Sequence, residues 1–111
     1  MTYLILSDDN DKAIADFTKA IELRPDVAQA YNNRGNVYTN KGDFGKALED
    51  LNKAIEIDPN YANAYNNRAS IHMKMQNYDQ SWEDVHKAEA LGVLVEPKVL
   101  EELKKVSGRT S

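Results

Sequence analysis

Apolar and polar residues recur along most of the chain with the spacing of amphipathic α-helices. Intervals of three and four between apolar positions predict helices over 11–23, 27–41, 44–57, 61–75 and 78–91. Turn-forming residues mark the boundaries. Pro25 and Pro59 disfavour helical geometry in the residue before them, while Gly42 and Gly92 permit the left-handed backbone that closes a helix. The pattern therefore predicts an all-α chain.

Short polar side chains stand just before several of these helices. Asp26, Asp43 and Asn60 are each expected to cap the helix that follows, because their oxygens can accept from free backbone N–H groups. The acidic cluster over 7–11 is interpreted in the same way, as an N-cap at the positive end of a helix dipole, separating it from an apolar piece over 1–7. The spacing of these acidic residues does not fit a calcium-binding loop.

A further amphipathic helix is predicted near the C-terminus. Glu96 can cap it, and Pro97 would occupy its first turn, where a missing N–H costs little. Its apolar stripe comprises Val99, Leu100, Leu103 and Val106. Because the outer face is charged, we expect this helix to act as a lid over the segment before it, with a frayed tail over 107–111.

A repeat of 34 residues organises the sequence. The pentapeptide Ala30–Arg34 returns unchanged as Ala64–Arg68. Other residue types recur with the same step, namely Asp16, Asp50 and Asp84; Lys19, Lys53 and Lys87; and Ala20, Ala54 and Ala88. A fixed period of this length is typical of stacked supersecondary units. We expect one domain over 1–106, with a truncated first repeat over 1–27, complete repeats over 28–61 and 62–95, and a capping helix over 96–106.

The repeat resembles the tetratricopeptide repeat (TPR), a helix–turn–helix unit of this length. Counted from Ala28, the positions that carry the resemblance are Tyr31, Gly35, Tyr38, Ala47, Leu51, Ala54 and Pro59. Two departures are visible: Val93 stands where the second unit would carry proline, and Arg34 and Arg68 occupy a place where the family has leucine. The resemblance implies an α-solenoid of antiparallel helix pairs, about two and a half repeats long, with a concave and a convex side.

In the family the first helix of each pair lines the concave groove. The resemblance places there Gln29, Asn32, Asn33, Asn36, Thr39 and Asn40 from one repeat, and Asn63, Asn66, Asn67, Ser70, Met73 and Lys74 from the next. Seven of these twelve residues are asparagine, which is a poor helix former. A primary amide offers two donors and an acceptor, so it can pair with the N–H and C=O of an extended peptide.

This asparagine-rich stripe has two interpretations. It resembles the asparagine ladder of the TPR superhelix in O-linked N-acetylglucosamine transferase, which implies a groove that binds peptide backbone. Alternatively, the amides keep the concave face soluble, or Asn32 and Asn33 bond to neighbouring helices. TPR clamps for chaperone tails need cations where Asn32, Asn33, Asn66 and Asn67 stand, so a chaperone-tail adaptor is disfavoured.

Other residues that could carry chemistry favour structural roles. Arg34 and Arg68 are expected to pack their stems between helices, with the guanidinium groups reaching acids. His72 occupies an aromatic core place, and no carboxylate is evident around it. Trp82 and Tyr78 are expected to pack against the lid helix.

Composition excludes several functions. The 111 residues carry a net charge of −4, which argues against nucleic acid and anionic membrane surfaces as partners. With no cysteine, no nucleophile–base pair and no metal-ligand spacing, the sequence indicates no cofactor and no catalysis. The absence of a signal-peptide pattern favours a cytoplasmic location. The predicted function is non-catalytic binding of a protein or peptide partner.

The truncated first repeat suggests an alternative function. Its apolar residues would lack part of their cover, and exposed apolar surface of this kind marks an interface. We therefore consider a self-assembly module that forms a homodimer through Leu4, Leu6, Ile14, Phe17 and Ile21.

Overall fold

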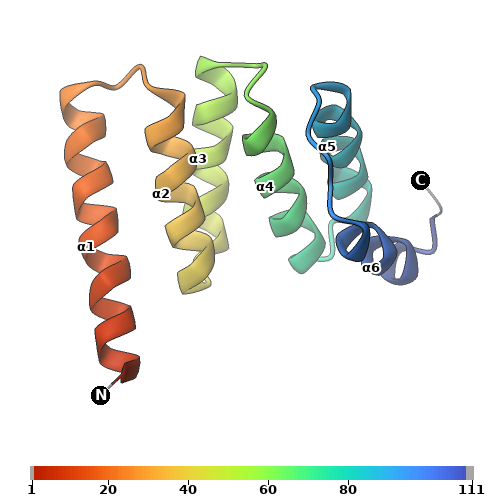
Figure 1. Cartoon of the computed structure of the whole chain (residues 1–111), viewed down its shortest axis with the longest axis horizontal. Coiled ribbons are helices and arrows are strands. Elements are labelled where there is room, and N and C mark those ends of the chain that lie inside the picture. Colours follow the sequence, from red (N-terminus) through yellow and green to blue (C-terminus); the bar gives the residue numbers. More distant parts are fainter. Residues whose placement is uncertain (1, 110–111) are drawn as a thin grey trace. The chain divides into compact units, whose positions relative to one another are not determined.

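The computed structural model describes the backbone of residues 2–109 and the side chains of residues 9–109. Within this part of the chain there are six helices and no strand (Figure 1). The helices are α1 (Thr2–Leu23), α2 (Ala28–Lys41), α3 (Phe44–Ile57), α4 (Ala62–Lys74), α5 (Tyr78–Ala90) and α6 (Pro97–Ser107). They form two compact units, Met1–Pro59 and Asn60–Ser111. The predicted all-α solenoid fold is confirmed.

In the first unit α2 packs against both α1 and α3 (Figure 1). The core of the α2–α3 pair contains Ala47, Leu51 and Ala54, all fully buried. Gly35 allows the close approach, since a Cβ there would lie only 3.2 Å from the Leu51 Cγ and 3.3 Å from the Ala47 carbonyl oxygen. The small residues of the repeat therefore set the distance between the two helices.

In the second unit α5 packs against both α4 and α6. The residues one period on are again buried: Ser81, Val85 and Ala88. The Ser81 hydroxyl donates a 2.8 Å hydrogen bond to the Ala69 carbonyl, so it joins α5 to α4 without leaving a buried polar group unsatisfied.

The turns inside the two helix pairs have the same backbone geometry with different residues. Gly42 ends α2 at φ 82°, and the Asp43 carboxylate accepts a 3.3 Å hydrogen bond from the Lys46 N–H, which confirms the predicted cap of α3. One period later Gln76 takes the position of Gly42 at φ 66°. A side chain in this left-handed region is under strain that glycine avoids.

The lid helix forms as predicted, with Pro97 in its first turn and Gly108 closing it at φ 73°. Leu103 is fully buried, and the Trp82 Nε1 donates a 3.1 Å hydrogen bond to the Ser107 Oγ. The contact of Trp82 with the lid is therefore confirmed. Val106, which was predicted to belong to the apolar stripe of this helix, is 43% exposed and does not join its buried part.

Three boundary predictions are wrong. Helix α1 runs without a break from Thr2, so residues 7–11 are helical rather than a cap. Extending an existing helix adds one hydrogen bond for each residue fixed, whereas a new start needs a costly nucleus. Asp26 does not cap α2, because Val27 occupies the N-cap position and the Asp26 carboxylate lies 3.7 Å from the Arg24 guanidinium instead. Asn60 does not stand at the N-cap of α4 either, because Tyr61 occupies that position.

Candidate functional site: the amide stripes of α2 and α4

Helix α2 presents three faces with different partners. Gly35 lies on the face toward α3. Arg34 and Lys41 lie on the flank toward α1, where they bond to Thr18 at 3.1 Å and to Asp11 at 2.6 Å. At 100° per residue, the stripe of Gln29, Asn33, Asn36 and Asn40 then falls on the side opposite α3. We call these four residues the α2 stripe.

Helix α4 has the same division of faces. The Ala69 carbonyl and the Arg68 guanidinium both bond to α5, so they define the packed side. The stripe opposite that side contains Asn63, Asn67, Ser70 and Lys74. We call these residues the α4 stripe, with Asn66 on its flank.

The amides differ in how far they are already satisfied. Among the described residues, the side-chain amides of Asn33, Asn36 and Asn66 make no hydrogen bond, and each residue is partly exposed. Gln29, Asn40 and Asn63 are exposed and equally unpaired within the described chain. Asn67 and Lys74 make further interactions in the fold. The first six therefore keep both amide donors and the acceptor available for a molecule outside the chain.

Asn32 stands apart from the other predicted groove residues. It is only 4% exposed and has an interaction within the fold, so its amide is not presented at the surface. The hydroxyls of the stripe region are also partly engaged, because Thr39 Oγ donates to the Gly35 carbonyl at 2.9 Å and Ser70 Oγ to the Asn66 carbonyl at 3.4 Å. Sequence periodicity alone does not distinguish Asn32 from Asn33.

Two arginine–aspartate clamps hold the helix pairs together. Arg34 donates from Nε and one terminal nitrogen to the Asp50 carboxylate at 2.8 and 2.7 Å. One period later Arg68 makes the same two bonds to Asp84, both at 2.8 Å. Each aspartate is 5% exposed. These hydrogen bonds raise the pKa of both guanidinium groups, against the opposing effect of burial.

The clamps confirm the predicted structural role of both arginines and name the acids that the sequence analysis left unnamed. Aromatic rings add to each site, since Arg34 lies 5.8 Å from the Tyr31 ring centroid and Arg68 lies 5.6 Å from that of Tyr65. The signal for the acids was present in the sequence, because both aspartates follow their arginine by 16 residues.

His72 lies beside the second clamp, at the position where the first complete repeat has Tyr38. Its Nε2 is 3.9 Å from the Asp84 carboxylate, so the expectation that no carboxylate surrounds it is wrong. The carboxylate comes from the next helix, which residue spacing could not place. The His72 Nδ1 is buried without a hydrogen-bond partner in the described chain, and burial lowers the pKa of the ring despite the nearby acid.

The structure describes only part of the predicted self-association surface. Ile14, Phe17 and Ile21 are half-buried in α1. The side chains of Leu4 and Leu6 lie outside the described residues. Self-association through this edge stays a prediction.

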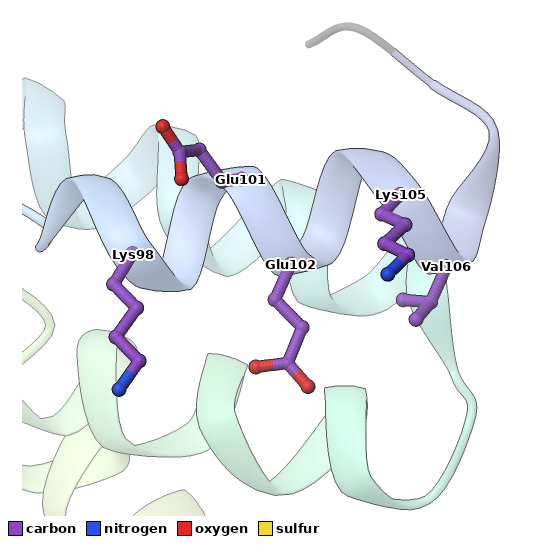
Figure 2. Close-up of a pocket in the computed structure, with 5 residues that line it drawn as sticks. All are labelled: Lys98, Glu101, Glu102, Lys105 and Val106. Atoms are coloured by element: carbon purple, nitrogen blue, oxygen red, sulfur yellow. The ribbon is translucent and has the colours of Figure 1, made fainter.

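A shallow depression on α6 carries no convergent chemistry. It measures about 370 Å³ and is lined by Lys98, Glu101, Glu102, Lys105 and Val106, all from one helix (Figure 2). Two lysines and two glutamates balance in charge, and Figure 2 shows Glu101 directed away from the others. An open surface whose positive and negative side chains balance one another does not define a binding site.

Two searches of the described residues bear on other functions. No group of three or more His, Asp or Glu side chains among them is arranged to hold a metal ion. None of the described helices combines the length and apolarity that crossing a bilayer requires.

Comparison with solved structures supports the same architecture. The first TPR of Spaghetti (RPAP3), bound to the HSP90 peptide SRMEEVD, matches with a TM-score of 0.81 at 23% identity, covering 96% of this chain and 84% of that one. The TPR2B domain of yeast Sti1, in a pHsp70 complex, matches with a TM-score of 0.74 at 25% identity over the same shares. MamA matches with a TM-score of 0.73 at 29% identity, covering 78% of this chain and 51% of MamA. No curated protein matches the sequence.

The family assignment comes from the repeat sequence itself. The TPR repeat family matches residues 6–42 and 35–76, which together span more than half of the chain. The helix pairs, the small residues between them and the solved neighbours all agree with this match. The chain therefore belongs to the tetratricopeptide repeat family.

Proposed function

We propose that the chain is a non-catalytic interaction module whose α2 and α4 stripes bind an extended peptide through asparagine side chains. The observation that carries this proposal is the set of unpaired, accessible amides at Gln29, Asn33, Asn36, Asn40 and Asn63, on faces that the helix packing leaves open. A half-exposed amide without an internal partner is free to exchange water for a peptide group.

Amide chemistry favours the backbone of the peptide over its side chains. One carboxamide can donate to a peptide C=O while it accepts from a peptide N–H, and each bond contributes roughly 0.5–1.5 kcal/mol net. Because every residue except proline offers both groups, such a stripe binds by conformation and tolerates varied sequences.

The solved neighbours support peptide binding in general and differ in chemistry. The peptide in the RPAP3 structure, SRMEEVD, carries three carboxylate side chains. The α2 stripe has no cation, and the α4 stripe has only Lys74, which already makes an interaction within the fold. With a net charge of −4 the chain is also repelled by acidic peptides. We therefore propose a partner segment that is uncharged or basic.

A peptide-array experiment tests this function. The intact chain is incubated with an array of uncharged, basic and acidic peptides, the last including SRMEEVD. We expect retention on uncharged or basic peptides, with Asn33→Ala/Asn63→Ala reducing it about tenfold, the loss expected for two hydrogen bonds. The matched control is Gln80→Ala, which removes an exposed amide from α5.

Two results would contradict the proposal. Equal retention by wild type and Asn33→Ala/Asn63→Ala would show that these amides do not take part in binding. Preferential retention on SRMEEVD would assign the chain to binders of acidic tails.

A further inference from the structure

The C-terminal end of the lid helix α6 is held against α5 by polar contacts that meet at Ser107. The Trp82 Nε1 donates to the Ser107 Oγ at 3.1 Å, and the Arg109 backbone N–H donates to the same oxygen at 3.2 Å. The Arg109 guanidinium lies 5.8 Å from the Trp82 ring centroid and bonds to Asp79 at 2.7 Å. A change at the Ser107 hydroxyl would therefore act directly on the joint between the two helices.

Ser107 lies where the chain can open locally. It is the last residue of α6, and Gly108 follows it at φ 73° with nothing within 4 Å of an added Cβ. Ser107 is half-buried, while Val106 and Arg109 beside it are exposed. The Ser107 Oγ accepts two hydrogen bonds and donates none within the part of the chain that the structure describes. Because the ends of helices open at low cost in free energy, this hydroxyl can be presented to an enzyme in an extended segment.

The charged residues closest to Ser107 in the sequence are cations. Lys104 and Lys105 precede it by three and two residues, and Arg109 follows it by two. All three are exposed. Opposite charges attract and orient an approaching partner, so this segment suits an enzyme whose substrate groove is acidic.

The other serine and threonine side chains that the structure describes lack this combination. Ser81 is buried and donates to a carbonyl of α4. Thr39 and Ser70 donate to carbonyls one turn back in their own helices, and Thr18 accepts from an arginine of α2 inside α1. Within the described chain, Ser107 is therefore the hydroxyl that combines a helix end with exposed cations on both sides.

We propose that Ser107 is a phosphorylation site for a serine kinase that selects basic substrates, and that the phosphate releases the end of α6 from α5. The Ser107 Oγ attacks the γ-phosphorus of ATP, so a new O–P bond forms while the bond to the bridging oxygen breaks. ADP leaves with that electron pair, and the hydroxyl proton passes to the catalytic carboxylate of the kinase. This inference is independent of the amide stripes.

A phosphate on Ser107 would weaken the joint in two ways. It carries about 1.5 to 2 negative charges at pH 7, which the negative end of the α6 dipole repels. It also offers acceptor oxygens that compete with Asp79 for the Arg109 guanidinium. Because Trp82 is only 2% exposed and burying a charged phosphate is costly, the phosphate turns toward solvent and the hydrogen bond from the Trp82 Nε1 is lost.

Phosphorylation of the intact chain tests the assignment of the site. The chain is incubated with MgATP and cyclic-AMP-dependent protein kinase, which selects basic substrates, and the modified residue is located by fragmentation mass spectrometry. We expect one phosphate, on Ser107, and none on the Ser107→Ala chain. Lys104→Gln/Lys105→Gln should lower the initial rate at least about tenfold, because the cations steer the segment into the acidic groove.

A matched control and a second measurement complete the test. Lys12→Gln/Lys19→Gln removes two exposed lysines from α1 and should retain the wild-type rate. Trp82 is the single tryptophan of the chain, so its fluorescence reports on the joint. Phosphorylation should shift its emission to longer wavelength and increase quenching by acrylamide, and phosphatase treatment should reverse both changes. Ser107→Ala removes the hydrogen bond without adding charge, and Trp82 should stay protected from the quencher.

Three results would overturn the proposal. An unmodified chain, or a phosphate on another residue such as Thr110, would remove the assignment of Ser107. Equal rates for the wild type and Lys104→Gln/Lys105→Gln would show that the cations do not direct the kinase. Unchanged Trp82 emission and quenching after phosphorylation of Ser107 would show that the lid stays in place. None of these results bears on peptide retention by the amide stripes, so this proposal and the proposed function fail separately.

Discussion

Arg34 and Asp50 are joined by two hydrogen bonds, at 2.8 and 2.7 Å, across the packed face between α2 and α3. Arg68 and Asp84 repeat this arrangement between α4 and α5. Leucine at this place, as in most of the family, would contribute apolar contact alone. The arginine adds a fixed orientation, because its planar fork matches a carboxylate in one geometry.

Removing one partner of a clamp is predicted to be strongly destabilising. Asp84→Asn should lower the free energy of unfolding by about 3 kcal/mol, because it leaves a half-buried guanidinium without its counter-charge. Asp16→Asn should change it by less than about 0.5 kcal/mol, as an exposed substitution does. Urea denaturation measures both. A similar loss at the two positions would show that Asp16 is already paired in the free chain.

Replacing the residue with positive φ in the turn at Gln76 is predicted to stabilise the fold. Gln76→Gly should raise the free energy of unfolding by about 1 kcal/mol, since glycine adopts φ 66° without the clash of a Cβ. Gly42→Gln should lower it by a similar amount at the equivalent turn, where nothing else lies within 4 Å of an added Cβ. Thermal denaturation of both variants provides the comparison. Destabilisation by Gln76→Gly would mean that the glutamine side chain has a role that the backbone geometry does not reveal.

The contact between Gly35 and Leu51 predicts a coupled pair of substitutions. Gly35→Ala alone should lower the free energy of unfolding by about 1–3 kcal/mol, because the new methyl group meets Leu51 at 3.2 Å. The second repeat carries Ala69 and Val85 in these places. Adding Leu51→Val should therefore recover part of the loss.

A double-mutant cycle by urea denaturation measures this coupling. Gly45→Ala is the control for helix propensity, since an added Cβ there has no neighbour within 4 Å, and it should be mildly stabilising. Simple additivity of Gly35→Ala and Leu51→Val would contradict the packing argument.

His72 predicts a pH dependence of stability. Burial holds the pKa of His72 below its ordinary value of 6.5, with Asp84 and Glu83 opposing the shift and Arg68 reinforcing it. Between that value and the folded-state pKa, the unfolded chain binds more protons than the folded chain. Stability should therefore fall as the pH falls below 6.5, and His72 should contribute no slope above it.

His72→Tyr copies Tyr38 of the first complete repeat and tests this dependence. The variant should lose the slope and gain about 1 kcal/mol, because the unpartnered Nδ1 is removed. His86→Gln, an exposed position, should retain the slope. Denaturation midpoints across the acidic range supply the measurement. If the stability of the wild-type chain rises as the pH falls below 6.5, the predicted direction of the pH dependence is wrong.

Periodicity predicted most of the fold and little of the site. The bounds of α3, the glycine turn at Gly42 and the lid helix followed from the sequence, because local turn chemistry and apolar spacing determine them. The continuous start of α1 was missed, because cap-forming residues are a weak signal when an apolar pattern continues through them. The distinction between buried Asn32 and accessible Asn33 depends on helix packing, which the order of residues does not encode locally.

Asp16 shows the same limit on what can be predicted from the order of residues. Its period with Asp50 and Asp84 was visible, yet only burial showed that two members are clamped and one is exposed. Repetition in the sequence indicates equivalent positions, and the structure then shows which of them lack their counterpart.

The side-chain amide resonances test the central claim, peptide binding by the amide stripes, most directly. Two-dimensional ¹H–¹⁵N NMR of the intact chain follows the NH₂ groups of Asn33, Asn36 and Asn66 during titration with an uncharged extended peptide retained on the array. We predict saturable shifts of these groups, with the exposed amide of Gln80 unmoved. Binding that shifts backbone signals elsewhere and leaves all three asparagine amides unchanged would contradict the account.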